Sequence, residues 1–397
     1  MPSNNYLNEA DIAIIGAGIM GSSIAFQISR SSDKKVILID QYPPVGGMSG
    51  RTFGQIRQHY SNEILVKLSI RGFEVLRNWQ QEVGVGDPGY ARMGYLLLVV
   101  EKQLAALQRN INLGQQSGVD TRFVVGHEIS AIEPLLSTDD LAGGAYEVNG
   151  GFIDVTKMVL SWLTAAQQFG VQFHPGVTVQ DIHTSDNKVT GLETDQGFVK
   201  ADTVINATGA WGRDLLLPLG IEVPIERRRL DMAYMRLPNN VAQLGCCITD
   251  GNSNVVIRPD LGRDFLAVAY APTIPIVDDP FSPASKQEIN EHHDRIRAAL
   301  SERLPALTGS TVTRDISGSY DVTPDYHPIL GWSPVDGLYL AMGFSGHGLK
   351  LAPAIGEVVA DNVLGKSSAF DIDPLRLSRF AENDLMYLAY GPNSARA

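Results

Sequence analysis

Residues 16–21 have the sequence Gly-Ala-Gly-Ile-Met-Gly, and this stretch decides the fold. A short apolar run precedes it at residues 11–15, and a second apolar run occupies residues 35–39. The intervening segment 19–29 is typical of a helix, so the order is strand, helix, strand. The glycines therefore lie in a strand-to-helix turn, which is the context that a G-x-G-x-x-G motif requires.

Each glycine of this motif has a physical task. Gly16 permits the tight turn, Gly18 lets the backbone approach a pyrophosphate, and Gly21 allows the helix to pack closely on the strand. The helix N-terminus offers unpaired N–H groups to phosphate. Asp40 ends the second strand, where a carboxylate would accept hydrogen bonds from the ribose hydroxyls of an adenosine and disfavour a 2′-phosphate. The sequence predicts dinucleotide binding and leaves both FAD and NAD open.

A second glycine-rich turn, GFSGHG at residues 343–348, follows an expected strand at 337–342 and precedes an expected helix at 349–364. The N-terminus of that helix would provide a fixed positive partner for the charge on a reduced flavin. A simple helix cap, in which the glycines only turn the chain, is the competing interpretation.

Length, charge and cysteine content exclude several classes of protein. The chain has 397 residues, 44% of them apolar, and a net charge of −12, which disfavours a nucleic-acid partner. The two cysteines, Cys246 and Cys247, are neighbours and are expected to be free thiols in a reducing compartment. No signal peptide and no membrane-spanning run is evident, so we expect a cytoplasmic protein without membrane insertion.

The remaining pattern predicts an α/β protein, α+β overall, with antiparallel insertions. Further helices are expected at 63–83, 104–113, 155–169 and 289–304, and strands at 94–100, 170–179, 188–194, 197–206, 255–258 and 265–270. Because no linker separates two halves and glycine turns lie near both ends of the chain, an interleaved domain is expected. The pair His292 and His293 cannot share one helix face, and we predict no metal site. Arg227, Arg228 and Arg229 favour a solvated or ion-paired strand edge.

Five segments together resemble the D-amino-acid oxidase superfamily of FAD enzymes, in the branch of sarcosine oxidases, dimethylglycine dehydrogenases, glycine oxidases and proline dehydrogenase subunits. They are GAGIMG with Asp40, GMSGRTFGQIRQHY (47–60), NATGAW (206–211), YDVTPDYHPILG (320–331) and GFSGHGLKLAPAIG (343–356). The resemblance implies a Rossmann-like FAD-binding domain, formed by residues 9–84, 150–215 and 322–390. It implies that a mostly antiparallel substrate-binding domain is formed by residues 85–149 and 216–321.

The resemblance also implies site residues. Arg57 and Lys350 would hold a substrate carboxylate, so that the carbon-hydrogen bond of the substrate faces the flavin. His347 could hydrogen-bond the flavin ring or the substrate, or only rigidify its loop, and Tyr320 could line the pocket or only pack. The positions that would contact FAD are Gly16, Gly18, Ile19, Met20, Gly21, Asp40, Gln41, Ser49, Arg51, Thr52, Gly54, Gln55, Val179, Ala207, Gly209, Trp211, Gly343, Ser345, Gly346, Gly348, Leu349 and Lys350.

Five positions depart from the family pattern and sharpen the expectation. Gly318 and Thr52 occupy positions at which some members attach the flavin covalently, so noncovalent FAD is expected. Ala267 and Ala271 replace the oxygen-activating lysine and the nearby histidine of monomeric sarcosine oxidases, which leaves O2 and an electron carrier both open as acceptor. Tyr320 stands where glycine oxidases carry an arginine, which favours a secondary or tertiary amine.

The expected activity is oxidation of the C–N bond of a sarcosine-like or proline-like amino acid to an imine, by hydride transfer to flavin N5. Three alternatives stay open: a biosynthetic flavoenzyme that oxidises a ring C–N bond, a non-catalytic FAD-binding subunit of a larger dehydrogenase, and an NAD-dependent dehydrogenase. The partners expected are a small amine or amino acid and the electron acceptor, and the sequence is compatible with a homo-oligomer.

Overall fold

A mostly parallel sheet brings together strands from both ends of the chain in the computed structural model, which describes residues 6–239, 241–260, 264–270 and 274–391. Its parallel strands are β1 (Tyr6–Ile15), β2 (Val36–Asp40), β9 (Gln172–Pro175), β12 (Gly197–Asn206) and β19 (Leu338–Met342). Strands β10 (Val179–Ser185), β11 (Lys188–Thr194) and β18 (Ile329–Trp332) extend it with antiparallel pairings. Asn206 pairs with Ile15 on one side and with Leu340 on the other, so three strands end at the same sheet edge.

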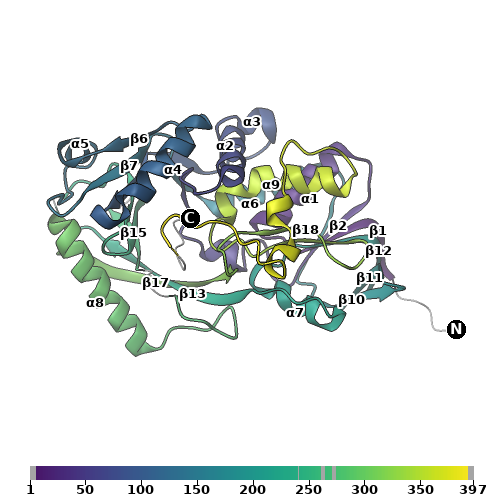
Figure 1. The fold of residues 1–397 in the computed structure, drawn as a ribbon. Coiled ribbons are helices and arrows are strands. Elements are labelled where there is room, and N and C mark those ends of the chain that lie inside the picture. The colour runs from purple at the N-terminus through teal and green to yellow at the C-terminus, as the bar shows by residue number, and fades with distance from the viewer. Residues whose placement is uncertain (1–5, 240, 261–263, 271–273, 392–397) are drawn as a thin grey trace.

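Helices from distant parts of the chain cover one face of this sheet (Figure 1). They are α1 (Ile19–Ser31), α2 (Glu63–Arg77), α6 (Val155–Gln168) and α9 (Gly348–Val363), and their buried apolar side chains share one core with the sheet. Ser23 of α1 donates a hydrogen bond to the Ala352 carbonyl of α9 over 2.8 Å. The helices that follow the two glycine turns are therefore packed directly on each other.

A second, mostly antiparallel sheet lies beside the first. Its order is β17 (Thr311–Val322), β13 (Glu226–Arg236), β16 (Phe265–Tyr270), β15 (Val255–Asp260), β14 (Cys247–Asp250), β5 (Tyr95–Val99), β7 (Gly143–Glu147) and β6 (Thr121–Val124), in which only the pair β14 and β5 is parallel. Helix α8 (Lys286–Arg303) packs its buried residues into the core of this sheet and lies at the opposite end of the molecule from α1 (Figure 1).

Smaller elements complete the described chain. A short sheet of β3 (Gln55–Ile56), β8 (Gly151–Ile153) and β4 (Tyr90–Arg92) joins the segment after β2 to the segment before α6. The remaining α-helices are α3 (Trp79–Glu82), α4 (Leu104–Gln116), α5 (Gly126–Ile132) and α7 (Gly212–Leu216).

We propose that the chain forms two interleaved domains with the boundaries expected from the sequence. Support comes from the membership of the sheets. Every strand of the mostly parallel sheet comes from within 6–40, 172–206 or 329–342, and every described strand of the antiparallel sheet comes from within 95–147 or 226–322.

Two expected elements were wrong in detail. The helix expected at 63–83 is broken at Asn78, whose side-chain amide donates to the Glu74 carbonyl and so competes with continued helix. The strand expected at 170–179 is divided into β9 and β10, because Gly176 turns the chain with a φ of +75°. The start of α8 also differs. Ser285 and Glu288 form a capping box, a sequence signal that would have placed the start of α8 correctly at Lys286.

Replacing Gly21 with valine is expected to yield protein that retains little FAD. A Cβ at Gly21 would overlap the carbonyl oxygen of Gly16, so α1 would be pushed away from the turn that it follows. The flavin absorbance per protein after gel filtration measures retention, and Gly126→Val is the control, since Gly126 is also a helical glycine without a positive φ and a Cβ there has no atom within 4 Å. Equal flavin content in both variants would contradict the role of Gly21.

Candidate active site

A cavity of about 420 Å³ opens where β1, β2, β12 and β19 end. Its walls combine the turn after β1, the segment 45–52, the turn after β12 and the turn before α9. Most of the positions expected to contact FAD line it: Gly16, Gly18, Ile19, Met20, Asp40, Gln41, Ser49, Arg51, Thr52, Val179, Ala207, Gly209, Trp211, Gly346, Gly348 and Leu349. Tyr320 lines it too, and burial raises the pKa of the Tyr320 phenol to about 12.

Other expected positions lie behind this wall. Gly21 packs under Gly16, Gly54 lines a neighbouring cavity, and Gln55 begins β3. Gly343 and Ser345 belong to the second glycine turn, and both bond to Asp321. These five residues therefore support the cavity wall from behind. The direct contacts with FAD that were expected for them stay predictions.

Asp321 organises the second glycine turn and was not singled out from the sequence. One of its carboxylate oxygens accepts the Gly343 N–H over 2.7 Å and the Phe344 N–H over 3.1 Å, and its carbonyl accepts the Ser345 N–H over 3.1 Å. Burial raises the pKa of the Asp321 carboxyl to about 6, although those backbone hydrogen bonds lower it. An acidic residue close to the end of a strand, followed by a glycine-rich turn later in the chain, is a signal that could have found it.

Asp40 ties the first glycine turn to the end of β2. Its two carboxylate oxygens accept the Ala17 N–H over 2.7 Å and the Tyr42 N–H over 2.8 Å. Burial raises the pKa of this carboxyl, while the two hydrogen bonds lower it. Each oxygen keeps a further lone pair, so the carboxylate can hold the turn and still accept a hydrogen bond from a ribose hydroxyl.

The residues around this cavity fit a dinucleotide cofactor. Helix α1 starts without a side-chain cap at Gly18, and the first turns of α1 and α9 carry no acidic residue that would repel phosphate or an anionic ring. A Cβ at Gly16 would lie 2.6 Å from the Ala207 carbonyl oxygen, so glycine allows the two turns to approach each other. Gly318 and Thr52 line the cavity and carry neither a thiol nor an imidazole for covalent attachment, and both cysteines are buried outside its lining.

A second group of polar residues surrounds the ring of Tyr60. One of them, Lys350, directly follows the cavity residue Leu349 in the sequence. The Arg57 guanidinium carbon lies 5.0 Å and the Lys350 Nζ 5.7 Å from the centre of this ring, and the His347 ring centre lies 5.5 Å from it. All four side chains are buried. The structure therefore brings together the two expected cations and His347 around Tyr60, a residue that was not singled out from the sequence.

Burial and mutual repulsion set the charge states in this group. Burial and the Arg57 charge hold the pKa of Lys350 well below its ordinary value, and burial, Lys350 and Arg57 do the same to the pKa of His347. Burial also raises the pKa of the Tyr60 phenol. Among the described residues, both ring nitrogens of His347 and the Tyr60 hydroxyl have no hydrogen-bond partner, which favours a ligand-binding role of His347 over loop rigidification.

The segment 386–390 packs against the chain that carries Arg57. The Arg57 guanidinium donates to the His59 carbonyl, and the His59 ring shares a 2.7 Å hydrogen bond with the Tyr390 hydroxyl. Burial and Arg57 lower the pKa of His59 to about 3, so this ring is neutral. Asn62 donates to the Tyr387 carbonyl over 2.8 Å and bonds the His327 ring over 2.9 Å.

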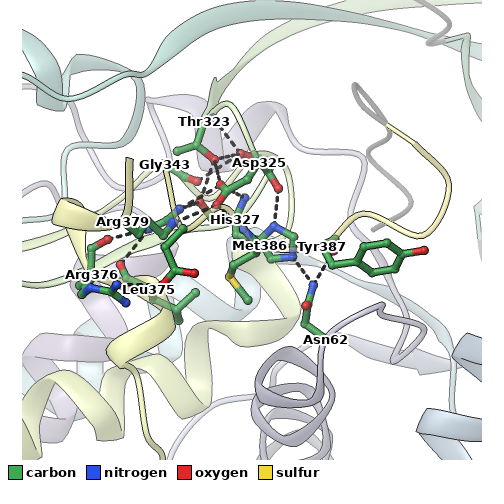
Figure 2. A network of polar contacts seen from close by, with 12 residues as sticks. Asn62, Thr323, Asp325, His327, Gly343, Leu375, Arg376, Arg379, Met386 and Tyr387 are labelled. Atoms are coloured by element: carbon green, nitrogen blue, oxygen red, sulfur yellow. Dashed lines mark hydrogen bonds and ion pairs between the residues drawn. The ribbon is translucent and has the colours of Figure 1, made fainter. Parts of the chain in front are cut away.

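A buried ion pair anchors the same region, as Figure 2 shows. Arg379 donates to both carboxylate oxygens of Asp325, over 2.8 and 3.0 Å, and to the His327 carbonyl over 2.9 Å. Thr323 also donates to that carbonyl. His59 and His327 thus act in packing and hydrogen bonding, as their position in the network indicates.

Other candidates lie outside the site. Arg227 pairs with Asp214, Arg228 with Glu226 over 2.6 Å, and Arg229 with Glu288 over 2.6 Å, so the expected ion pairing is confirmed, on a strand that lies inside the sheet between β17 and β16. Ala267 is buried in a small apolar cluster with Phe53, while Ala271 lies outside the described residues. Within the described ranges, no group of three or more His, Cys, Asp or Glu side chains is arranged to hold a metal ion.

Comparison with known proteins establishes the family. The family model DAO, "FAD dependent oxidoreductase", matches residues 11–362, so the chain belongs to this family and FAD is its cofactor. A 4-methylaminobutanoate oxidase (formaldehyde-forming) of Paenarthrobacter nicotinovorans is 26% identical over 94% of this chain and 46% of its own length. The mitochondrial sarcosine dehydrogenase of Homo sapiens is 25% identical over 96% of this chain and 42% of its own length. The chain spans less than half the length of these two relatives.

Solved structures share the fold. The L-proline dehydrogenase from P. horikoshii superposes with a TM-score of 0.85 at 23% identity, over 96% of this chain and all of that chain. The glycine oxidase from Geobacillus kaustophilus superposes with a TM-score of 0.81 at 24% identity, over 94% of this chain and 99% of that chain. The expected Rossmann-like FAD-binding fold is thereby confirmed. None of the described helices combines the length and the apolar character that crossing a bilayer would require.

Proposed function

We propose that this flavoprotein oxidises the C–N bond of an amino acid, or of an N-alkylated amino acid with a secondary or tertiary amine, to an imine. The observation that carries the proposal is the pair of buried cationic side chains, Arg57 and Lys350, gathered at one tyrosine next to the cofactor cavity. Two basic side chains this close together in a buried site favour the binding of an anion, and a substrate carboxylate is such an anion. FAD supplies, when bound, the acceptor for the hydride.

The side chains of this chain would bind and orient the substrate. The planar fork of Arg57 suits a bidentate contact with a carboxylate, and Lys350 adds a point charge. His347 is neutral and has two ring nitrogens without partners in the described structure, so it can hydrogen-bond the cofactor ring or the substrate amine. Burial of the group excludes water, and this strengthens the contacts with the substrate. The contacts in turn hold the reacting bond in one orientation.

The amine class is proposed from two observations. Tyr320, an uncharged side chain, lines the cavity where glycine oxidases are expected to carry an arginine. The names of the two relatives described above refer to oxidation of N-methylated amines. These features favour a sarcosine-like or proline-like substrate, with O2 or an electron carrier as acceptor. We also propose that FAD is bound noncovalently. We propose a cytoplasmic location as well, which the two buried free thiols support.

Anaerobic titration of the purified, flavin-loaded protein with sarcosine-like, proline-like and primary amino acids tests the proposal. We expect bleaching of the oxidised flavin band by secondary or tertiary amino acids, with slower or no bleaching by primary ones. Admission of air then distinguishes an oxidase, which recovers the band within seconds, from a dehydrogenase. Absence of bleaching with every amine would favour a non-catalytic subunit, and reduction only by a ring amine that is not proline-like would favour a biosynthetic enzyme.

A further inference from the structure

A buried glutamate stands behind the two cationic side chains. Glu147 ends β7, where it pairs in register with Tyr95 of β5 and Thr121 of β6. Its side chain turns toward the segment that carries Arg57, and its Oε2 accepts the Gln58 N–H over 2.7 Å. The residue is 1% exposed, and among the described residues its Oε1 has no hydrogen-bond partner.

Charged and titratable groups face this carboxyl from several elements. Arg57 and Lys350 of α9 act on it as cations, while the phenols of Tyr60 and of Tyr90 in β4 lie within its field. Burial raises the pKa of Glu147 to about 7, although the Gln58 hydrogen bond and both cations lower it. Glu147 in turn raises the pKa of Lys350, whereas burial and the Arg57 charge lower it. Near neutral pH, the Glu147 carboxyl group is therefore partly protonated and partly ionised.

We propose that Glu147 is the proton store of the substrate site: it takes up one proton when a substrate carboxylate binds at Arg57 and Lys350. This inference rests on the proposed function. The reason is electrostatic, because a second carboxylate beside the same two cations in a buried site disfavours the ionised form of the first. The orphaned Oε1 is the atom that receives the proton.

The proton comes from the substrate itself. An amino acid reaches the site as a zwitterion but gives up hydride only as the free amine, so one ammonium N–H bond must break. The proton forms an O–H bond at Glu147, and no electrons are transferred between groups. The net charge of site plus substrate stays constant, because a zwitterion and a glutamate anion become a carboxylate anion and a neutral acid.

Infrared difference spectra of the flavin-loaded protein with and without propionate, a carboxylate without an amine, test this directly. At pH 8, about one unit above the pKa of about 7, Glu147 starts mostly ionised, so propionate should produce the C=O stretch of a protonated carboxyl group. Because propionate has no ammonium group, Glu147 takes this proton from the buffer. At pH 6 the acid is already mostly protonated, so the band in the difference spectrum should shrink. We expect the pH 8 band in wild-type protein and no such band in Glu147→Gln.

Glu133→Gln is the matched control. Glu133 is also buried, with a pKa raised by burial, and its carboxylate accepts N–H groups from Gly245 over 2.7 Å and Leu135 over 3.2 Å. It lies in the packing around α5, and neither Arg57 nor Lys350 acts on it. The propionate band should persist in this variant. If Glu147→Gln does not fold, wild-type protein with ¹³C at the glutamate carboxyl groups replaces it, and the band must shift to lower wavenumber.

The possible failures have different meanings. Propionate binding without the band, a band that persists in Glu147→Gln, or a band unmoved by the isotope would each overturn the role of Glu147 and leave the carboxylate site standing. Failure of wild-type protein to bind propionate or any amino acid would instead overturn the proposed function.

Discussion

Replacing Arg57 with alanine is expected to lower kcat/KM for a carboxylate-bearing amine by about 100-fold, with unchanged FAD content. The guanidinium is buried 5.0 Å from the ring centre of Tyr60, and its loss removes a charge-assisted contact worth about 3 kcal/mol in a site closed to water. The loss should fall mainly on KM if the contact binds substrate and transition state equally, and on kcat if it also aligns the reacting bond.

Steady-state kinetics with two substrates separates this role from general damage. An amine of the same size without a carboxylate should lose little on the same substitution, because it makes no contact with Arg57. Arg77→Ala is the control, since Arg77 is an exposed residue at the end of α2. The carboxylate clamp would be wrong if Arg57→Ala kept wild-type kcat/KM, or if both substrates lost activity equally.

The second large effect concerns stability. Arg379→Met is expected to lower the free energy of unfolding by about 3 to 5 kcal/mol, because it leaves the buried Asp325 carboxylate without its counter-ion. Both side chains are at most 1% exposed, and three hydrogen bonds from the guanidinium to Asp325 and to the His327 carbonyl disappear with it. Burial alone would raise the pKa of Asp325, but the hydrogen bonds and charge of Arg379 hold it below its ordinary value.

Urea denaturation of the flavin-loaded protein measures this loss. Arg376→Met is the neighbouring control, since Arg376 pairs with acidic groups on the surface and its loss should cost far less. The double variant Arg379→Met/Asp325→Asn should recover part of the stability, because it removes the orphaned charge and keeps an oxygen acceptor for the N–H groups of His327 and Met386. An equal loss in Arg379→Met and Arg376→Met would show that the ion pair contributes no more than a surface pair.

Local patterns predicted the elements that hold the cofactor. The turn at Gly16 and the helix after it depend on residues close in sequence, and both lie where the glycine spacing placed them. Helix α2 shows where such reasoning fails. Its apolar periodicity continues past Asn78, but the side-chain hydrogen bond of Asn78 ends the helix there.

The substrate site could be predicted only in part. Arg57 and Lys350 were expected from the family resemblance, and the structure places both at Tyr60. Glu147 and Tyr390 have no distinguishing pattern in the sequence, because each matters only through a partner on a distant segment. Burial gives these residues their properties, and a polar residue in a sequence does not reveal whether folding will bury it.

The central place of β1 in the first sheet also constrains how the protein is made. Its partner β2 is synthesised directly afterwards, whereas β12 ends only at Asn206, and the cavity wall is incomplete until Leu349 has been translated. Pairings so distant along the chain close slowly. The wall of the cofactor cavity can therefore be complete only after most of the chain has been synthesised.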